Sequence, residues 1–403
     1  MRILLLNSVC GVTSTGRICA DLAKAYEENG HEVKIAYGRD DKGMTDARAR
    51  YGVRIGTDLD VKLHGLRTRL LDQHGFGSRR ATAHFLKWVD SYAPDVIHMH
   101  NLHGYYINIE LLFRYIKEKN IPVVWTLHDC WALTGHCTHF TACGCTKWKT
   151  GCAHCPQKHK YPVSNCMDGS KANYRRKKEA FTGVSNLILT TPSAWLKSLI
   201  EQSYLREYEV QVVNNGIDTS VFKPTASDLR ERYGLTGQKI ALGAANGWGP
   251  HKGLHYLERM AGDLPEGWKV VVVGLSAERI EHLPRNVLGI QRTNSPQELA
   301  AWYTAADVFV NPTLEDNYPT TNLEAQACGT PVVTFNSGGA LETLVPGNGY
   351  AVERLQYDAL LGKTIRAAEL KGGKLCLEVK DKHSLGLEFL RVYQRLLHQE
   401  GSM

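Results

Sequence analysis

The sequence lacks any apolar run long enough to cross a bilayer, because no stretch of its 403 residues approaches the ~18 unbroken apolar residues that a membrane span needs. It also lacks the pattern of a signal peptide, since the apolar run after Arg2 is short and no clear cleavage site follows it. We therefore interpret the first residues as a buried strand and expect a cytoplasmic protein.

The chain has little excess charge of either sign. Its 48 Lys and Arg residues and 41 Asp and Glu residues give a net charge of +7, which suits phosphate-bearing ligands or an anionic membrane surface. This excess is too small to predict a nucleic-acid partner. Basic residues gather in segments 51–92 and 171–178, which we interpret first as solvated helix faces and second as contacts with a lipid diphosphate or the inner face of the membrane.

The pattern of apolar segments predicts an α/β protein with two doubly wound domains. Short apolar runs alternate with helix-period segments, which is typical of a parallel sheet covered on both faces. A chain of 403 residues also exceeds what one hydrophobic core usually organises. The expected strands of the first series are 2–7, 32–37, 95–100, 123–128 and 187–191, and those of the second are 240–245, 270–275, 287–291, 308–311 and 332–335.

The turn-forming run 214–218 marks the expected domain boundary. We predict an N-terminal domain over residues 1–213 with a Cys-rich insertion at about 130–166, and a C-terminal domain over 214–383. A last helix over 384–403 is expected to pack back, with the N-terminal domain as one candidate surface.

The stretch 311–332 is the most informative part of the sequence. An expected strand is followed by the acidic turn 315–317 and by a short helix beginning near Thr320. This arrangement aims a helix N-terminus at the carboxyl edge of the sheet, where open α/β sheets bind ligands and where backbone N–H groups favour a diphosphate. From spacing alone, Glu324 suits a capping box with Thr321 equally well, and 315–317 suits a plain polar turn.

Three further positions follow expected strands and are candidate ligand contacts. Lys252 lies in the loop 244–253 after the first strand of the second series, and Gly16 lies in a glycine loop after the first strand of the chain. His128 closes the strand 123–128. Loops in these places gather ligand-binding residues, although a lone histidine is more often structural and the pattern Gly-x-Gly-x-x-Gly is absent.

These motifs resemble those of the retaining glycosyltransferases of family 4. The resemblance rests on two acids eight positions apart ahead of Ala325 to Val333, on Lys252 before Gly253, and on the junction 215–218. It implies the GT-B fold, with two Rossmann-like domains facing a central cleft, the first binding the acceptor and the second the nucleotide-sugar donor.

The resemblance also implies roles for individual residues. Asp316 takes the place of the acid that contacts the donor sugar, and Glu324 takes the place of the acid that binds the ribose hydroxyls. Lys252 is implied to neutralise the donor diphosphate, and His128 to lie over the donor sugar. The expected catalytic residues are therefore His128, Asp316 and Lys252. Many members have an arginine at the position of Gly247. The expected donor-binding residues are Gly16, Arg17, His251, Lys252, Asp316, Asn317, Thr320, Thr321, Asn322 and Glu324, of which His251 or Arg17 can replace the missing cation.

The run His128-Asp129-Cys130-Trp131, followed by Thr134 to Cys137 and Cys155 to Gln157, is similar to enzymes of bacterial capsule, colanic-acid and O-antigen assembly. The resemblance therefore implies transfer of a hexose or N-acetylhexosamine from a UDP- or GDP-sugar to a lipid-linked surface glycan, with retention of configuration and no cofactor for catalysis. The alternatives are a nucleotide-sugar 2-epimerase of the same architecture and a zinc-containing nucleic-acid binder.

Most of the eleven cysteines lie between Cys130 and Cys166. In an unexported chain they are expected to be thiols or metal ligands rather than disulfides. Four thiolates can close a tetrahedral zinc site and fix a long loop that has no core of its own. The candidate ligands of such a structural zinc are Cys137, Cys145, Cys152 and Cys155, and the alternative is free buried thiols.

Overall fold

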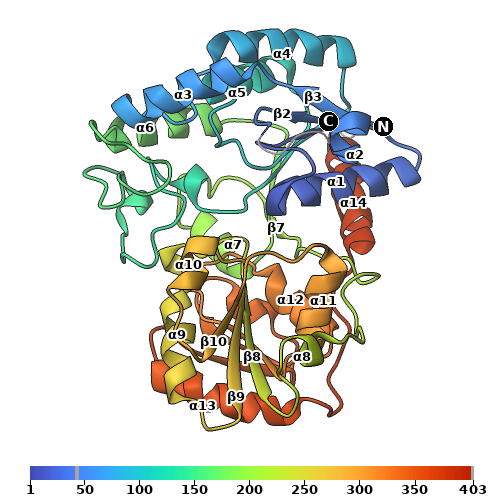
Figure 1. Ribbon diagram of the computed structural model, residues 1–403. Helices are drawn as coiled ribbons and strands as arrows, with labels where there is room; N and C mark the ends of the chain where they lie inside the picture. The colour runs from blue at the N-terminus through green and yellow to red at the C-terminus, as the bar shows by residue number, and fades with distance from the viewer. Residues whose placement is uncertain (41–44, 401–403) are drawn as a thin grey trace. The chain divides into compact units, whose positions relative to one another are not determined.

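The computed structural model of the protein describes residues 1–40 and 45–400 and divides the chain into two units. The first unit contains residues 1–214 and the C-terminal segment from Lys382, and the second contains residues 215–381. Each unit has one parallel sheet with helices on both faces (Figure 1), which confirms the predicted α/β class.

The sheet of the first unit is seven-stranded and parallel, in the order β3-β2-β1-β4-β5-β6-β7. The interior strand β1 pairs with β2 and β4, so that Ile3 lies opposite Val33 on one side and Val96 on the other. The strands are β1 (Arg2–Leu6), β2 (Glu32–Tyr37), β3 (Gly52–Arg54), β4 (Val96–Met99), β5 (Val123–Thr126), β6 (Leu187–Thr191) and β7 (Val210–Val212).

The helices of the first unit cover both faces of this sheet. They are α1 (Thr13–Glu28), α2 (Asp46–Tyr51), α3 (Asp58–Leu71), α4 (Arg79–Tyr92), α5 (Ile109–Lys119), α6 (Ser170–Phe181), α7 (Ala194–Ile200) and α14 (Lys382–Glu400). The last helix, α14, packs against α1, where Gly386 allows close approach to Ala25. The C-terminal helix is therefore part of the first unit.

A chain of buried polar groups runs through this unit from α1 to β6. The hydroxyl oxygens of Tyr26 and Tyr393 are 2.8 Å apart, and Tyr393 also contacts Nδ1 of His98 at 2.6 Å. Nε2 of His98 contacts the Thr126 hydroxyl at 2.7 Å, and the Thr126 and Thr190 hydroxyls are 2.6 Å apart. Burial holds the pKa of His98 well below its ordinary value, so this imidazole is neutral.

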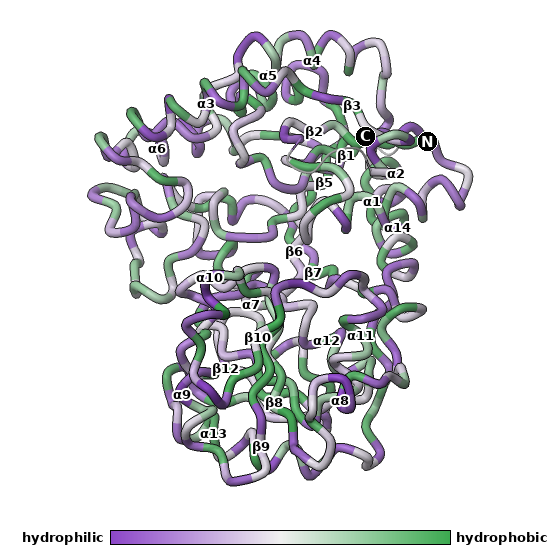
Figure 2. The backbone as a smooth tube through the Cα atoms, in the orientation of Figure 1, coloured by the Kyte–Doolittle hydropathy of each residue, from purple (hydrophilic) through white to green (hydrophobic). Residues whose placement is uncertain are grey.

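The second unit has a six-stranded parallel sheet in the order β10-β9-β8-β11-β12-β13. Figure 2 shows that β8 is hydrophobic along most of its length, as expected for a strand buried on both faces. The strands are β8 (Lys239–Ala244), β9 (Trp268–Val273), β10 (Val287–Ile290), β11 (Val308–Asn311), β12 (Val332–Asn336) and β13 (Gly349–Glu353).

The helices of the second unit are α8 (Leu229–Arg232), α9 (Leu254–Asp263), α10 (Ala277–Glu281), α11 (Pro296–Ala305), α12 (Thr320–Ala327) and α13 (Tyr357–Ala367). The start of α11 shows how the sequence sets these boundaries. The Ser295 hydroxyl accepts a hydrogen bond from the Glu298 amide, and Pro296 occupies the first helical position. The Glu298 carboxylate in turn accepts from the Asn294 amide at 2.6 Å.

Candidate functional site

The candidate donor site of the second unit is built from two loops that follow neighbouring strands. The strand order reverses between β8 and β11, which pair with each other. The loop after β8 contains the short 3-10 turn η3 (Pro250–Lys252), and the loop after β11 leads into α12. Both loops therefore leave the carboxyl edge of the sheet at its topological switch point, where open α/β sheets bind ligands.

An ion pair joins the two loops. The Lys252 ammonium lies 2.6 Å from Oδ2 of Asp316, and the two side chains are 29% and 20% exposed. The other carboxylate oxygen, Oδ1, accepts from the amide of Tyr318 at 3.3 Å. A lysine and an acid expected from the sequence to contact the same ligand are thus in direct contact, and both remain partly open to solvent.

Backbone contacts fix the position of this ion pair. The Leu314 amide donates to the His251 carbonyl at 2.7 Å, which ties one loop to the other. Gly253 has a φ of 74°, and an added Cβ would overlap the Pro312 carbonyl, so the residue after Lys252 must be glycine. The sequence pattern Lys-Gly therefore follows from the close approach of the two loops.

Glu324 lies on the second turn of α12 and is held by a buried tyrosine. The hydroxyl of Tyr303, on α11, donates to the Glu324 carboxylate at 3.0 Å, and Tyr303 itself is fully buried. The helix begins at Thr320 with Pro319 as its N-cap, so the capping box between Thr321 and Glu324 is not formed. The half-buried Glu324 carboxylate is instead oriented by Tyr303.

The remaining donor-site candidates surround the start of α12. Thr320 and Thr321 form its first turn and are half-buried, and Asn317 is buried in the loop before it. Asn322 is fully buried; its side-chain oxygen accepts from Asn311 at 2.9 Å, and its side-chain nitrogen donates to Thr343 at 2.8 Å. Asn322 therefore fixes the helix in the core, and donor contact by these residues stays a prediction.

Gly16 and Arg17 lie on α1 in the first unit. Gly16 is buried, and an added Cβ would lie 2.9 Å from Cγ2 of Val9, so the glycine permits tight packing of the loop after β1. Arg17 is exposed, and its Nε donates to the Thr13 carbonyl at 3.2 Å. Donor binding by these two residues remains a prediction.

His128 follows β5 and belongs to a group of histidines at the carboxyl edge of the first sheet. Its Nε2 lies 2.9 Å from Nδ1 of His100, which follows β4. Burial lowers the pKa of His128 to about 4, although Asp129 opposes this shift. Burial alone would raise the pKa of Asp129, but His103, whose Nε2 is 2.7 Å away, lowers it to about 2. His128 is therefore neutral at neutral pH, and Asp129 is charged.

The four candidate zinc ligands line one small cavity of about 20 Å³ in the loop between β5 and α6. A hydrogen bond between the Cys137 and Cys155 thiols lowers the pKa of Cys155 and raises that of Cys137. The Gly135 amide donates to the Cys152 sulfur at 3.2 Å. All eleven cysteines are free, and within residues 1–40 and 45–400 no three His, Cys, Asp or Glu side chains form a metal-binding group. Zinc binding by Cys137, Cys145, Cys152 and Cys155 therefore stays a prediction.

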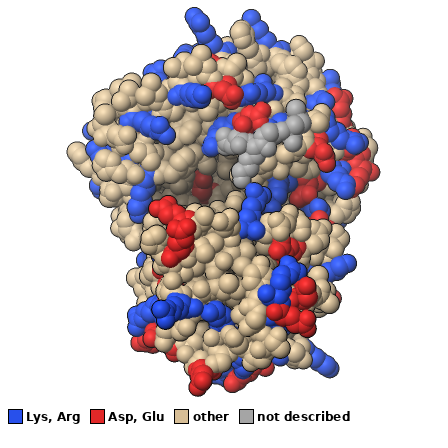
Figure 3. Space-filling view, viewed as in Figure 1, with Lys and Arg blue, Asp and Glu red and all other residues tan. Residues whose placement is uncertain are grey.

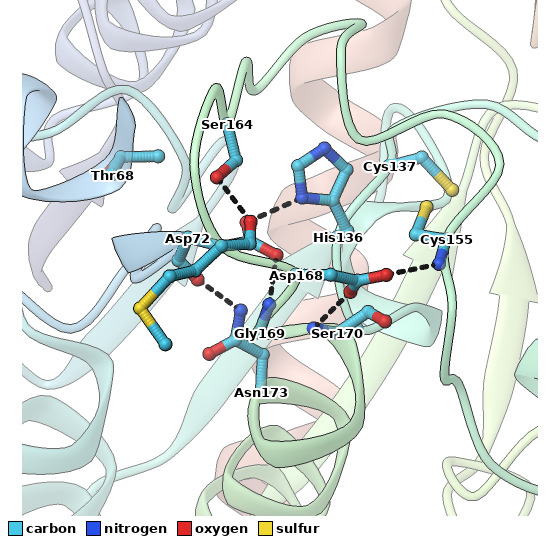
Figure 4. A network of polar contacts seen from close by, with 12 residues as sticks. Thr68, Asp72, His136, Cys137, Cys155, Ser164, Asp168, Gly169, Ser170 and Asn173 are labelled. Carbon is cyan, nitrogen blue, oxygen red and sulfur yellow. Dashed lines mark hydrogen bonds and ion pairs between the residues drawn. The ribbon is translucent and has the colours of Figure 1, made fainter. Parts of the chain in front are cut away.

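A buried ion pair anchors this loop to the rest of the first unit (Figure 4). Nδ1 of His136 lies 2.6 Å from Oδ1 of Asp72, and neither side chain is exposed. The other Asp72 oxygen accepts from the Gly169 amide at 2.8 Å, and the Asp72 carbonyl accepts from the Asn173 side chain. One carboxylate thus joins the end of α3, the Cys-rich loop and the start of α6.

Sequence reasoning missed Tyr303 and Asp72, which hold other groups in place. In the sequence, Tyr303 looks like an ordinary buried position of α11, and only the fold brings its hydroxyl to Glu324. Asp72 follows the last turn of a basic helix and looks like a solvated surface acid. Neither residue belongs to a motif, so the sequence carries no local signal for its role.

The residues that the structure describes contain no helix that is both long and apolar enough to span a bilayer.

Comparison with known proteins follows the division into two units. A family model described as Glycosyltransferase Family 4 matches residues 15–221, and one described as Glycosyl transferases group 1 matches residues 239–369. Over 268 residues the chain is 30% identical to the putative colanic acid biosynthesis glycosyl transferase WcaC of Escherichia coli K12, covering 64% of each chain. It is 27% identical to the capsular polysaccharide biosynthesis glycosyltransferase CapM of Staphylococcus aureus, covering 41% of this chain and 47% of CapM. The chain thus spans less than two thirds of the length of these curated relatives.

Solved structures resemble the whole chain. The Anabaena protein Alr3699/HepE in complex with UDP matches with a TM-score of 0.64 and 16% identity, covering all of both chains. WaaG, a glycosyltransferase involved in lipopolysaccharide biosynthesis, matches with a TM-score of 0.66 and 14% identity, covering 98% of this chain and 99% of WaaG. These likenesses show the GT-B fold.

Proposed function

Because the chain belongs to glycosyltransferase family 4, we propose that it transfers a sugar from a nucleotide-diphosphate sugar during assembly of a bacterial surface polysaccharide. The matched relatives WcaC and CapM are named for colanic acid and capsular polysaccharide biosynthesis, which supports this class of pathway. Alr3699/HepE has been solved with UDP and with UDP-glucose, which supports a nucleotide-sugar donor.

The contact between Lys252 and Asp316 at the switch point of the second sheet is the observation that carries this proposal. A diphosphate leaving group gains negative charge as the glycosidic bond to the donor breaks, and a positioned ammonium stabilises it. Lys252 ends the turn η3 just before α9, is held there by Asp316 and is still partly exposed, so an entering diphosphate can share its ammonium. The backbone N–H groups at the start of α12 add a second centre of positive potential.

The acids near this cation suit the neutral part of a donor. Glu324, oriented by Tyr303, offers a carboxylate to the vicinal hydroxyls of a ribose. Asp316 accepts hydrogen bonds from the sugar once its ion pair with Lys252 is shared with the diphosphate. His128 of the first unit is neutral because burial lowers its pKa, and its contact with the donor sugar remains a prediction from the family resemblance.

The finer parts of the proposal concern the substrates. We expect a hexose or N-acetylhexosamine from a UDP- or GDP-sugar, a lipid-linked acceptor at the cytoplasmic face of the membrane, and retention of configuration. Proton NMR of the product reports the anomeric configuration. Transfer of radiolabelled sugar into extracted lipid distinguishes transfer from 2-epimerisation, which would leave the label in the nucleotide sugar.

Titration calorimetry with UDP and with GDP tests the donor site. Lys252→Ala removes the ammonium and Glu324→Gln removes the carboxylate, while Lys374→Ala and Glu266→Gln make the same changes at exposed positions of the second unit. We expect one nucleotide to bind and each site variant to raise the Kd about 10- to 100-fold, because hydrogen bonds to charged groups contribute ~1.5–3 kcal/mol.

The controls should bind the nucleotide as the unmodified protein does. If neither nucleotide binds, or if the site variants and the controls bind equally, the proposed donor site is wrong. Thermal unfolding of all four variants shows whether each remains folded.

A further inference from the structure

The helix α3 (Asp58–Leu71) exposes a stripe of leucines. Leu59, Leu63, Leu66 and Leu70 are 64%, 55%, 53% and 45% exposed. With 3.6 residues per turn, their spacing of four, three and four residues places them on one face of the helix. A continuous apolar stripe of this kind is unusual on a soluble surface, where exposed leucines normally occur singly.

The opposite face of α3 buries two polar side chains and packs Val61 against the core. Thr68 is fully buried and His64 is 2% exposed. Nε2 of His64 accepts from the amides of Gly75 and Gly77 at 3.2 Å each. Burial lowers the pKa of His64 to about 4, which keeps the ring neutral and able to accept these bonds. The helix is thus inverted relative to an ordinary surface helix, which buries its apolar face.

Both ends of α3 are fixed in this orientation. At its start, Thr57 and Asp60 form a capping box, with the Thr57 amide donating to the Asp60 carboxylate at 2.8 Å. At its end, Asp72 adopts a left-handed conformation and joins the buried network with His136 (Figure 4). Rotation of α3 to bury its leucines would break these bonds and those of His64, so the outward leucine face is part of the fold.

Basic side chains flank the leucine stripe on both sides. Helical geometry places Lys62 and Arg69 along one edge of the stripe and Arg67 along the other, and all three are exposed. The acids of α3 lie only in its first turn, where Asp60 is in the capping box and Asp58 forms an ion pair with Arg54. From Lys62 to Leu71 the helix therefore carries positive charge only.

The apolar surface extends beyond the end of α3. Met167 is 53% exposed, and its amide donates to the Leu70 carbonyl at 3.3 Å. Lys171 and Arg175 are exposed on the neighbouring helix α6. In Figure 3, Lys and Arg side chains, with some Asp and Glu side chains between them, are spread over the largely uncharged surface in the upper part of the view, where Figure 1 places α3 and α4.

We infer that the leucine face of α3 docks on an anionic lipid bilayer. A stripe of leucines bordered by Lys and Arg matches the interfacial region, where the leucines enter the acyl boundary and the cations meet lipid phosphates. A protein partner of matching shape would need no cationic border on both edges. This surface adds to the proposed function a physical route to a lipid-linked acceptor, but it does not depend on nucleotide binding.

Vesicle flotation tests this inference with phosphatidylcholine vesicles that contain phosphatidylglycerol and with vesicles of phosphatidylcholine alone. We expect the protein to float with the anionic vesicles and much less with the neutral ones. Leu63→Gln combined with Leu66→Gln keeps helix propensity and should lower binding about tenfold or more. Lys62→Gln combined with Arg69→Gln should lower binding to anionic vesicles and reduce its dependence on salt, because Arg67 and the cations of α6 remain.

Leu341→Gln combined with Leu355→Gln is the matched control, because these leucines of the second unit are 50% and 57% exposed and lie outside α3. The control should bind vesicles as the unmodified protein does. The inference is overturned if the protein ignores anionic vesicles or if the α3 leucine variant binds them equally well. It is also overturned if light scattering without lipid finds a dimer that this variant dissociates, because the face would then join two copies.

Calorimetry with UDP and GDP on the same samples separates this result from the donor site. A leucine variant that loses vesicle binding and keeps nucleotide binding supports the surface alone. Nucleotide binding that is absent in every sample would count against the proposed function and leave the vesicle result intact.

Discussion

Replacing Asp72 with asparagine should destabilise the first unit by about 3 kcal/mol, since removing one partner of a buried ion pair costs ~3–5 kcal/mol. Asp72 and His136 are both fully buried and 2.6 Å apart. We expect the lower end of the range because the asparagine oxygen can still accept from the Gly169 amide, which now donates to Oδ2. For a unit of this size, the loss corresponds to a fall of about 6 to 12 °C in melting temperature.

The pH dependence gives this prediction a second signature. Burial alone would lower the pKa of His136, but Asp72 outweighs burial and raises the pKa above its ordinary value of 6.5. A base whose pKa rises on folding contributes stability that is complete below its unfolded pKa and is lost as the pH rises through its folded pKa. The difference in stability between the unmodified protein and Asp72→Asn should therefore be largest below pH 6.5 and shrink as the pH increases.

Differential scanning calorimetry at several pH values measures both effects. Asp90→Asn is the matched control, because it makes the same change in the first unit at a carboxylate that is 49% exposed and pairs with Lys119. The reasoning would be refuted if the two variants melted at the same temperature. It would also be refuted if the effect of Asp72→Asn grew with increasing pH.

Two further predictions concern the second unit and the cysteine cavity. Tyr303→Phe removes the hydrogen bond that orients Glu324. This variant should weaken nucleotide binding about fivefold, a loss of ~1 kcal/mol, with little change in melting temperature. An unchanged Kd in calorimetry would show that Tyr303 does not position the acid. Mass spectrometry of the metal content should find about one zinc per chain in the unmodified protein. The zinc should be absent in Cys152→Ser and in Cys155→Ser but kept in Cys166→Ser, because the Cys166 side chain does not line the cavity. Zinc-free protein purified without chelators would show that the thiols are free.

The sequence predicted the parallel strands wherever an apolar run was long enough to be distinctive. The predicted strands 32–37, 187–191 and 308–311 have the same bounds in the structure, and the others differ by one or two residues at one or both ends. The strands β3 and β13 were missed. The strand β3 has only three residues, and β13 begins at Gly349 and contains polar residues, so neither shows a distinctive apolar run.

The candidate donor site could be predicted only where its residues form a local motif. Lys252 and Asp316 were placed by motifs, and the structure adds that they contact each other. Their meeting depends on the pairing of β8 with β11, which are far apart in the chain. The hydrogen bond of Tyr303 to Glu324 and the burial of His64, on the inward face of α3, likewise arise from tertiary packing, which periodicity does not report. The spacing of leucines normally predicts which face of a helix is buried. In α3 the leucines are exposed instead, so this rule predicts the wrong face.

The buried chain of polar groups from Tyr26 to Thr190 has a consequence for where its protons lie. A neutral imidazole donates through one nitrogen and accepts through the other, so His98 must pass the direction of hydrogen bonding from Tyr393 to Thr126 or in reverse. A hydroxyl that gives its only proton to His98 must accept from the next hydroxyl, whereas a hydroxyl that accepts from His98 can either donate to its other neighbour or accept from it. The tautomer of His98 therefore fixes the direction of both hydrogen bonds on the side where its imidazole accepts: from Tyr26 through Tyr393 if Nδ1 accepts, or from Thr190 through Thr126 if Nε2 accepts.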